Sequence, residues 1–124
     1  MSTERVVIVG ASPKPDRYAH KAQLALVRHG HVVVPVNPTL STTEIEGVPV
    51  VHDLGAVTGA VDTVTMYVGE KISAGMRDKL VALKPRRVIF NPGAENTLLA
   101  AELEKAGIRC EDACTLVLLG TGQF

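Results

Sequence analysis

The feature that most constrains the fold is a series of short apolar runs rich in β-branched residues, each bounded by charged residues, glycine or proline. The first run, residues 6–9, contains no polar residue, which is typical of a strand covered on both faces in a parallel sheet. Similar runs predict further strands at 32–36, 48–51, 62–68 and 88–90. The chain is therefore expected to form a sheet whose central strands are buried from both sides.

Apolar residues spaced three or four apart predict helices between these strands, over residues 18–29, 71–84 and 95–106. Gly30 and Gly107 follow the first and last of these helices, where a left-handed glycine commonly ends a helix. Residues 114–119 are expected to form a last strand or turn. The alternation of strands and helices predicts one α/β domain over residues 1–124, with a doubly wound, mostly parallel sheet of five or six strands and helices on both faces.

The composition narrows the possible partners. Thirteen Lys and Arg residues balance thirteen Asp and Glu residues, and the 124 residues include two Tyr, two Phe and no Trp. We expect no nucleic acid partner, because such proteins usually carry net positive charge or aromatic platforms for bases. No apolar run approaches the length of about 18 residues that spans a bilayer. We therefore expect a cytoplasmic protein without a membrane partner, present as a monomer or homodimer.

The loop after the first predicted strand carries the groups of an anion site. In an open parallel sheet, ligands bind beyond the carboxyl ends of the strands, where the strand order reverses. Gly10 permits a tight turn there, Ser12 supplies a hydroxyl, and Lys14 and Arg17 supply two cations. The helix that follows offers N–H groups without intrahelical partners. These groups predict a binding site for a phosphate. The alternative interpretation is an ordinary strand–helix turn whose charged residues lie at the surface.

The other loops at the same predicted edge carry polar and small residues. Asn37 and Pro38 follow the second strand, Gly69 follows the strand at 62–68, and residues 91–93 form an Asn-Pro-Gly loop. Asn37 is also consistent with a simple turn, and the glycines with helix entry. Together the four loops predict a site for an elongated, anionic small molecule.

The loops differ from the motifs of several other sites. Ser12 and Pro15 stand where a dinucleotide-binding loop carries its second and third glycines, and Asn37 stands where an acidic residue would bind the ribose. No metal site is expected, because His29 and His31 straddle the end of a predicted helix without a suitably spaced carboxylate or thiol. No catalytic residue is expected either, since Ser12 lacks a nucleophile elbow and an evident base.

Several segments together resemble the free-standing CoA-binding domain family, small relatives of the N-terminal domain of the succinyl-CoA synthetase alpha subunit. They are Val-Ile-Val-Gly-Ala-Ser-Pro-Lys at 7–14 with Arg17, Pro-Val-Asn-Pro at 35–38, and Gly-Val-Pro-Val at 47–50. The strand opened by Asp62, the loop at 91–93 and Cys114 also fit the family. The resemblance covers nearly the whole chain and implies a Rossmann-like sheet that holds coenzyme A across its carboxyl edge.

The resemblance also implies which residues contact the ligand. Ser12, Lys14 and Arg17 would hold phosphates, and residues 36–38 would line the nucleotide side. The expected contacts at the four loops are Gly10, Ala11, Ser12, Pro13, Lys14, Arg17, Tyr18, Val36, Asn37, Pro38, Tyr67, Val68, Gly69, Asn91, Pro92 and Gly93. Many relatives carry Tyr where His31 stands and a Gln-containing loop in place of residues 91–93.

The expected function is binding of coenzyme A or an acyl-CoA without catalysis, in sensing, carrying or docking on an acyl-CoA enzyme. One alternative is an NAD(P)-dependent oxidoreductase, and another is a structural partner subunit whose nucleotide cleft is vestigial. Cys114 is interpreted either as a core thiol or as a residue near the thiol end of bound coenzyme A, able to form a mixed disulfide with it.

Overall fold

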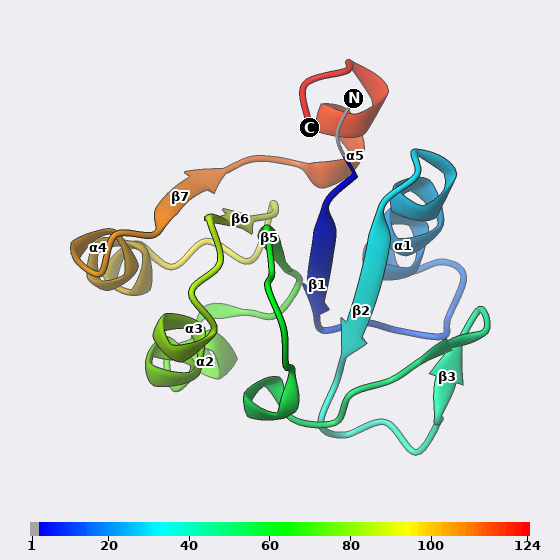
Figure 1. Ribbon diagram of the computed structural model, residues 1–124, viewed down its shortest axis with the longest axis horizontal. Helices are drawn as coiled ribbons and strands as arrows, with labels where there is room; N and C mark the ends of the chain where they lie inside the picture. The colour runs from blue at the N-terminus through cyan, green and yellow to red at the C-terminus, as the bar shows by residue number, and fades with distance from the viewer. Residues whose placement is uncertain (1–2) are drawn as a thin grey trace.

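The β-branched runs form the centre of a five-stranded parallel sheet in the computed structural model, which describes residues 3–124 (Figure 1). Its strands lie in the order β2-β1-β5-β6-β7, and every neighbouring pair is parallel. The strands are β1 (Arg5–Val9), β2 (Val32–Val36), β5 (Thr63–Met66), β6 (Arg87–Phe90) and β7 (Arg109–Asp112). The predicted single α/β domain with a mostly parallel, Rossmann-like sheet is therefore confirmed, with five strands.

Helices cover both faces of this sheet, as the unbroken apolar run of β1 predicts. Val6 and Ile8 belong to a core shared with α1 (Tyr18–Arg28) and α5 (Thr115–Gly120). Val7 and Val9 belong to a second core, shared with α3 (Arg77–Leu83) and α4 (Thr97–Lys105). Successive side chains of a strand point to opposite faces of the sheet, so the four consecutive apolar residues of β1 place two side chains in each core.

The order in which strands are added to the sheet reverses between β1 and β5, and this reversal positions the candidate site. From β1 the chain first adds β2 on one side, then crosses over to add β5, β6 and β7 on the other. The loops that leave β1 and β5 therefore diverge to opposite faces, and a crevice opens between them at the carboxyl ends of the strands.

A small hairpin lies outside the main sheet, and its second strand covers part of the strand predicted at 48–51. It consists of β3 (Glu44–Ile45) and β4 (Val48–Pro49), which pair antiparallel. Glu46 and Gly47 form its turn with φ of 51° and 77°, as a tight hairpin with two left-handed residues requires. Val51, two residues after the hairpin, forms an isolated parallel bridge with Val36 of the main sheet.

Two sequence predictions of local structure were wrong, and one strand was not predicted. The helix predicted over 71–84 is two short helices, α2 (Glu70–Ser73) and α3, separated by residues 74–76. Residues 114–119, predicted as a strand or turn, lie mostly in α5. Strand β7 was missed because its residues are polar and half-exposed, as is common at a sheet edge.

The predicted helix ends agree better with the structure. Gly30 and Gly107 have φ of 84° and 88° just beyond α1 and α4. The Ile108 N–H donates to the Leu103 carbonyl at 3.0 Å, the bond expected when a left-handed glycine ends a helix. α4 begins two residues later than predicted because Asn96 caps it, accepting from the Leu99 N–H at 3.0 Å. A short 3₁₀ helix, η1 (Leu54–Ala56), completes the elements.

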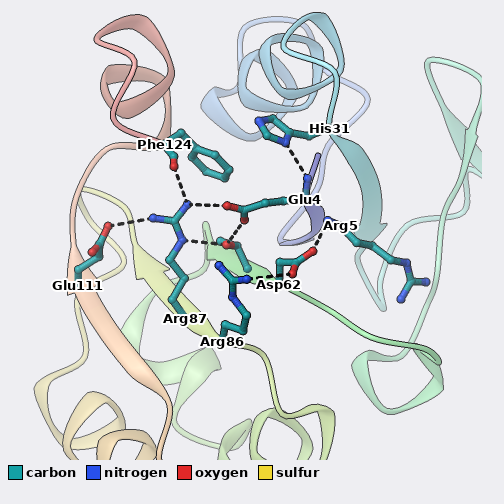
Figure 2. Close-up of polar contacts among 9 residues, drawn as sticks. Glu4, Arg5, His31, Asp62, Arg86, Arg87, Glu111 and Phe124 are labelled. Carbon is teal, nitrogen blue, oxygen red and sulfur yellow. Dashed lines mark hydrogen bonds and ion pairs between the residues drawn. The ribbon is translucent and has the colours of Figure 1, made fainter. Parts of the chain in front are cut away.

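An ionic network joins the strands at the end of the sheet opposite the crevice, and Arg87 is its centre (Figure 2). Arg87 is 7% exposed and donates from Nε to Thr63 Oγ1 at 2.8 Å. Its terminal nitrogens lie 3.6 Å from carboxylate oxygens of both Glu4 and Glu111, and its guanidinium stacks 4.4 Å from the Phe124 ring. Residues of β5, β6, β7 and both ends of the described chain are thereby held together, away from the crevice.

Replacing Arg87 with Ala is expected to lower the free energy of unfolding by about 3 kcal/mol, because two carboxylates lose their buried partner. Arg86→Ala is the matched control, since Arg86 is 76% exposed and its 3.8 Å pair with Asp62 should contribute less than about 1 kcal/mol. Urea denaturation measures both values. A similar, small loss in the two variants would contradict a stabilising role for the network.

Candidate functional site

Two adjoining cavities lie at the carboxyl ends of the strands. The larger has a volume of about 690 Å³ and the smaller about 310 Å³. Gly10, Asn37 and Val68 line both cavities, so the two form one elongated groove across the end of β1. The position agrees with the expectation for an open sheet whose strand order reverses next to β1.

The structure brings nearly all of the predicted site residues to this groove. The larger cavity is lined by Gly10, Ser12, Pro13, Lys14, Arg17, Tyr18, Asn37, Tyr67, Val68, Gly69, Asn91, Pro92 and Gly93. Val36 and Pro38 line the smaller one. Ala11 lines neither cavity and is fully buried, which makes it a core residue beneath the loop.

Other lining residues were not predicted. In the larger cavity they include Leu40 and Leu116, and Cys114 lies there as well. In the smaller cavity Asp53 and Lys79 form an ion pair of 2.6 Å beside apolar side chains that include Ile72 and Met76. That pair holds the pKa of the Asp53 carboxyl below its usual value, chiefly through the hydrogen bond from Lys79.

Gly10 is required where the loop leaves β1. Its φ is 89°, a left-handed value that favours glycine. A Cβ atom at this position would lie 2.9 Å from Val68 Cγ1 and 3.0 Å from the Tyr67 carbonyl oxygen. The Gly10 N–H donates to the Val36 carbonyl at 2.9 Å, which ties the loop to the end of β2. The absence of a side chain thus allows the loops after β1, β2 and β5 to meet.

Asn37 positions the loop through both ends of its side-chain amide. Its Nδ2 donates to the Ala11 carbonyl at 2.9 Å, and its Oδ1 accepts from the N–H and hydroxyl of Thr39 at 3.0 Å. Asn37 therefore shapes the turn that carries Ser12 and Lys14. The resemblance implies that the same residue faces the nucleotide.

The N-terminus of α1 is open and positively charged. No side chain caps it, and its first turn contains no acidic residue. Lys14 and Arg17 stand beside it, and among residues 3–124 no carboxylate lies within ion-pair distance of either. Unpaired N–H groups, the helix dipole and two cations in one place favour a phosphate.

Asn91 forms the floor of the larger cavity and is 2% exposed. Its Nδ2 donates to Thr65 Oγ1 at 2.7 Å and to the Met66 carbonyl at 2.8 Å, while its Oδ1 accepts from the Thr115 N–H at 2.9 Å. The Thr65 and Thr115 hydroxyls are 2.8 Å apart and complete the network. Asn91 thereby holds the start of α5, and with it Cys114, against the ends of β5 and β6.

Tyr67 and the two cysteines differ in their surroundings. Burial raises the pKa of Tyr67 to about 12, so its hydroxyl, which lies without a well-formed hydrogen bond, remains protonated at neutral pH. Burial also raises the pKa of Cys110 to about 11, with smaller contributions from Glu104 and Asp112. Cys114 lies at the groove instead.

The histidines do not converge on a metal. The His29 ring bonds to the Ala25 carbonyl of its own helix, whereas His31 Nδ1 accepts from the Glu4 N–H at 3.0 Å. Within residues 3–124 no three His, Cys, Asp or Glu side chains are grouped so that they could hold a metal ion. Every helix in this same range is too short or too polar to span a bilayer.

Comparison with known proteins gives one family and one fold. A family model described as a CoA binding domain matches residues 4–120. The crystal structure of an uncharacterized protein shares 37% identity with a TM-score of 0.92, and the match covers 100% of both chains. YneT of Bacillus subtilis (strain 168) is 35% identical over 65 residues, 52% of this chain and 47% of YneT, so the match spans about half of that relative.

A larger enzyme contains the same fold. It is the dinucleotide-forming acetyl-coenzyme A synthetase 1 of Ca. Korarchaeum cryptofilum, solved with phosphate and ADP. The TM-score is 0.74 at 21% identity, and the match covers 89% of this chain and 25% of that one. This likeness shows the fold, which in that protein is one part of a longer chain.

Gly10→Ala is expected to lower the free energy of unfolding by about 2 kcal/mol, because the added methyl group meets a left-handed backbone and the chain leaving β5. Gly75→Ala is the control, since a Cβ there meets no atom within 4 Å, and it should change stability by no more than about 0.5 kcal/mol. Equal effects in a denaturation experiment would show that close packing at Gly10 is unimportant.

The two thiols are expected to differ in reactivity. At pH 8, iodoacetamide should alkylate Cys114 in a Cys110→Ser variant faster than Cys110 in a Cys114→Ser variant. Because the thiolate fraction of a group with a pKa near 11 grows about tenfold per pH unit, Cys110 should react about 100-fold faster at pH 10 than at pH 8. Mass spectrometry gives the rates. A Cys110 rate that levels off below pH 9 would contradict the raised pKa.

Proposed function

The chain belongs to the CoA-binding domain family, and on that premise we propose that it binds coenzyme A or an acyl-CoA in the groove at the carboxyl edge of its sheet. The observation that carries the proposal is the open N-terminus of α1 beside Lys14 and Arg17, at the point where the strand order reverses. This is where a fold of this kind binds the phosphates of a nucleotide.

The phosphates of coenzyme A are assigned to the loop between β1 and α1. Ser12 and the first N–H groups of α1 would donate to the pyrophosphate, and Lys14 and Arg17 would neutralise its charge and that of the ribose phosphate. Hydrogen bonds between charged partners are roughly twice as strong as neutral ones, so these contacts would supply much of the affinity.

The two cavities suit the two ends of the ligand. The smaller one, with Pro38, Ile72 and Met76, offers apolar surface for an adenine ring and a polar rim at the Asp53–Lys79 pair. The larger one leads from the cations past the loop at 91–93 to Cys114, a path that suits the pantetheine arm. An acyl group or the free thiol would then lie near Cys114.

A non-catalytic role in sensing, carrying or delivering the ligand, or docking on an acyl-CoA enzyme, fits the side chains at this site. The nucleophile candidate Ser12 has its hydroxyl engaged with the Lys14 N–H at 3.1 Å, and Asn37 and Asn91 are engaged in positioning the backbone. The same fold forms 25% of the length of the acetyl-coenzyme A synthetase described above, which supports docking on such an enzyme.

Replacing Lys14 and Arg17 together with Ala is expected to weaken coenzyme A binding by about 2–4 kcal/mol, because two charge-assisted phosphate contacts are lost. Isothermal titration calorimetry measures the change. The native protein should also bind dephospho-coenzyme A more weakly than coenzyme A.

The matched control is the double variant Arg86→Ala, Lys105→Ala, which removes the same charge from side chains that are 76% and 77% exposed and remote from the groove. Its affinity should stay within twofold of native. Thermal shifts with coenzyme A and with NADPH, added separately, test the rival reductase, because only a ligand of the native state raises the melting temperature. A shift with NADPH alone would overturn the proposal.

A further inference from the structure

His20 is a buried polar residue of α1 that contacts the loop between β1 and α1, residues 10–17, which we call the phosphate loop. It is 3% exposed, and its Nδ1 lies 3.0 Å from the Ser12 carbonyl oxygen. A carbonyl oxygen can only accept, so Nδ1 donates this bond. The Ser12 carbonyl belongs to the peptide that leads into Pro13, and its orientation therefore sets the path of the chain toward Lys14.

The other side of the same ring contacts the β3–β4 hairpin. His20 Nε2 lies 3.2 Å from Glu46 Oε1 at the hairpin turn. One helical turn further on, Gln23 Nε2 donates to the Ile45 carbonyl at 3.0 Å, and Gln23 is 1% exposed. The hairpin is thus held against α1 by two buried side chains, one of which also holds the loop.

The hairpin side of the molecule also contributes to the groove. Leu40, in the segment that leads from β2 to the hairpin, lines the larger cavity together with Ser12 and Lys14. The His20 ring therefore links the loop on one wall of the cavity to the hairpin that follows Leu40 along the chain.

We propose that His20 is a positioning residue for ligand binding, which fixes the Ser12 peptide of the phosphate loop and couples that loop to the hairpin through Glu46. The inference rests on the proposed function, since it assigns a role in the same site. His20 does not contact the ligand in this account, but acts through the Ser12 carbonyl.

Two amide variants distinguish the two hydrogen-bonding contacts of the His20 ring. The amide nitrogen of Asn has the same bond count from Cβ as Nδ1, so His20→Asn keeps a donor for Ser12 and loses the Glu46 contact. The amide nitrogen of Gln corresponds to Nε2, so His20→Gln keeps the reach to Glu46 and loses the Ser12 bond. We expect the Kd for coenzyme A to rise at least tenfold in His20→Gln and by only about threefold in His20→Asn.

Glu46→Gly tests the hairpin contact without disturbing the buried ring. The Glu46 side chain is half-exposed and its φ of 51° suits glycine, so the variant should fold normally. The Kd should rise about threefold. Adding the same change to His20→Gln should weaken binding by less than twofold more, because the loop is already released. If the effects of Glu46→Gly and His20→Gln on the free energy of binding add fully in the double variant, the coupling between the loop and the hairpin would be overturned. An unchanged Kd in Glu46→Gly would overturn it as well.

A measurement without ligand keeps this inference separate from the proposed function. In ¹H–¹⁵N spectra of the free protein, the amide signals of Ser12 and Lys14 should move in His20→Gln and stay near their native positions in His20→Asn. Failure of the native protein to bind coenzyme A would overturn the proposed function, whereas equal shifts, or equal affinities, in the two His20 variants would overturn the positioning role.

Discussion

The burial of β1 from both faces is the constraint on which the rest of the structure depends. Val6 and Ile8 pack toward α1 and α5, and Val7 and Val9 toward α3 and α4. β1 also pairs with β2 on one side and with β5 on the other, which places it inside the sheet. A central first strand requires the chain to extend the sheet on one side and then on the other, and the reversal opens a crevice at its carboxyl end. The groove is therefore a consequence of the central position of β1 in the sheet.

The polar side chains that line the groove fall into two sets. One set is hydrogen-bonded within the protein, and our proposal assigns the other to the ligand. Asn37 and Asn91 use both ends of their amides within the protein, which fixes the loops after β1 and β6. Among residues 3–124, no side chain caps the first turn of α1 and no carboxylate pairs with Lys14 or Arg17, and our proposal assigns these groups to the phosphates. A preformed loop of this kind lowers the conformational entropy lost on binding. The ion network around Arg87 lies at the opposite end of the strands, away from the groove.

Much of the fold and the site could be predicted from the sequence because both depend on local patterns. The apolar run at 6–9 predicts a doubly covered strand, and the rule for open sheets directs attention to the loops that line the groove. The break at Gly75, the polar edge strand β7 and the hairpin could not be predicted, since tertiary packing decides them. Asp53 and Lys79 are 26 residues apart, and only the folded chain makes them a pair at the smaller cavity.

The central claim is that the loop between β1 and α1 holds the pyrophosphate of coenzyme A. A crystal structure of the protein grown with coenzyme A tests it most directly. The account requires the pyrophosphate within hydrogen-bond distance of Ser12 and the first turn of α1, with the pantetheine arm directed toward Cys114. An empty groove at saturating coenzyme A, or a ligand bound away from Lys14 and Arg17, would contradict it.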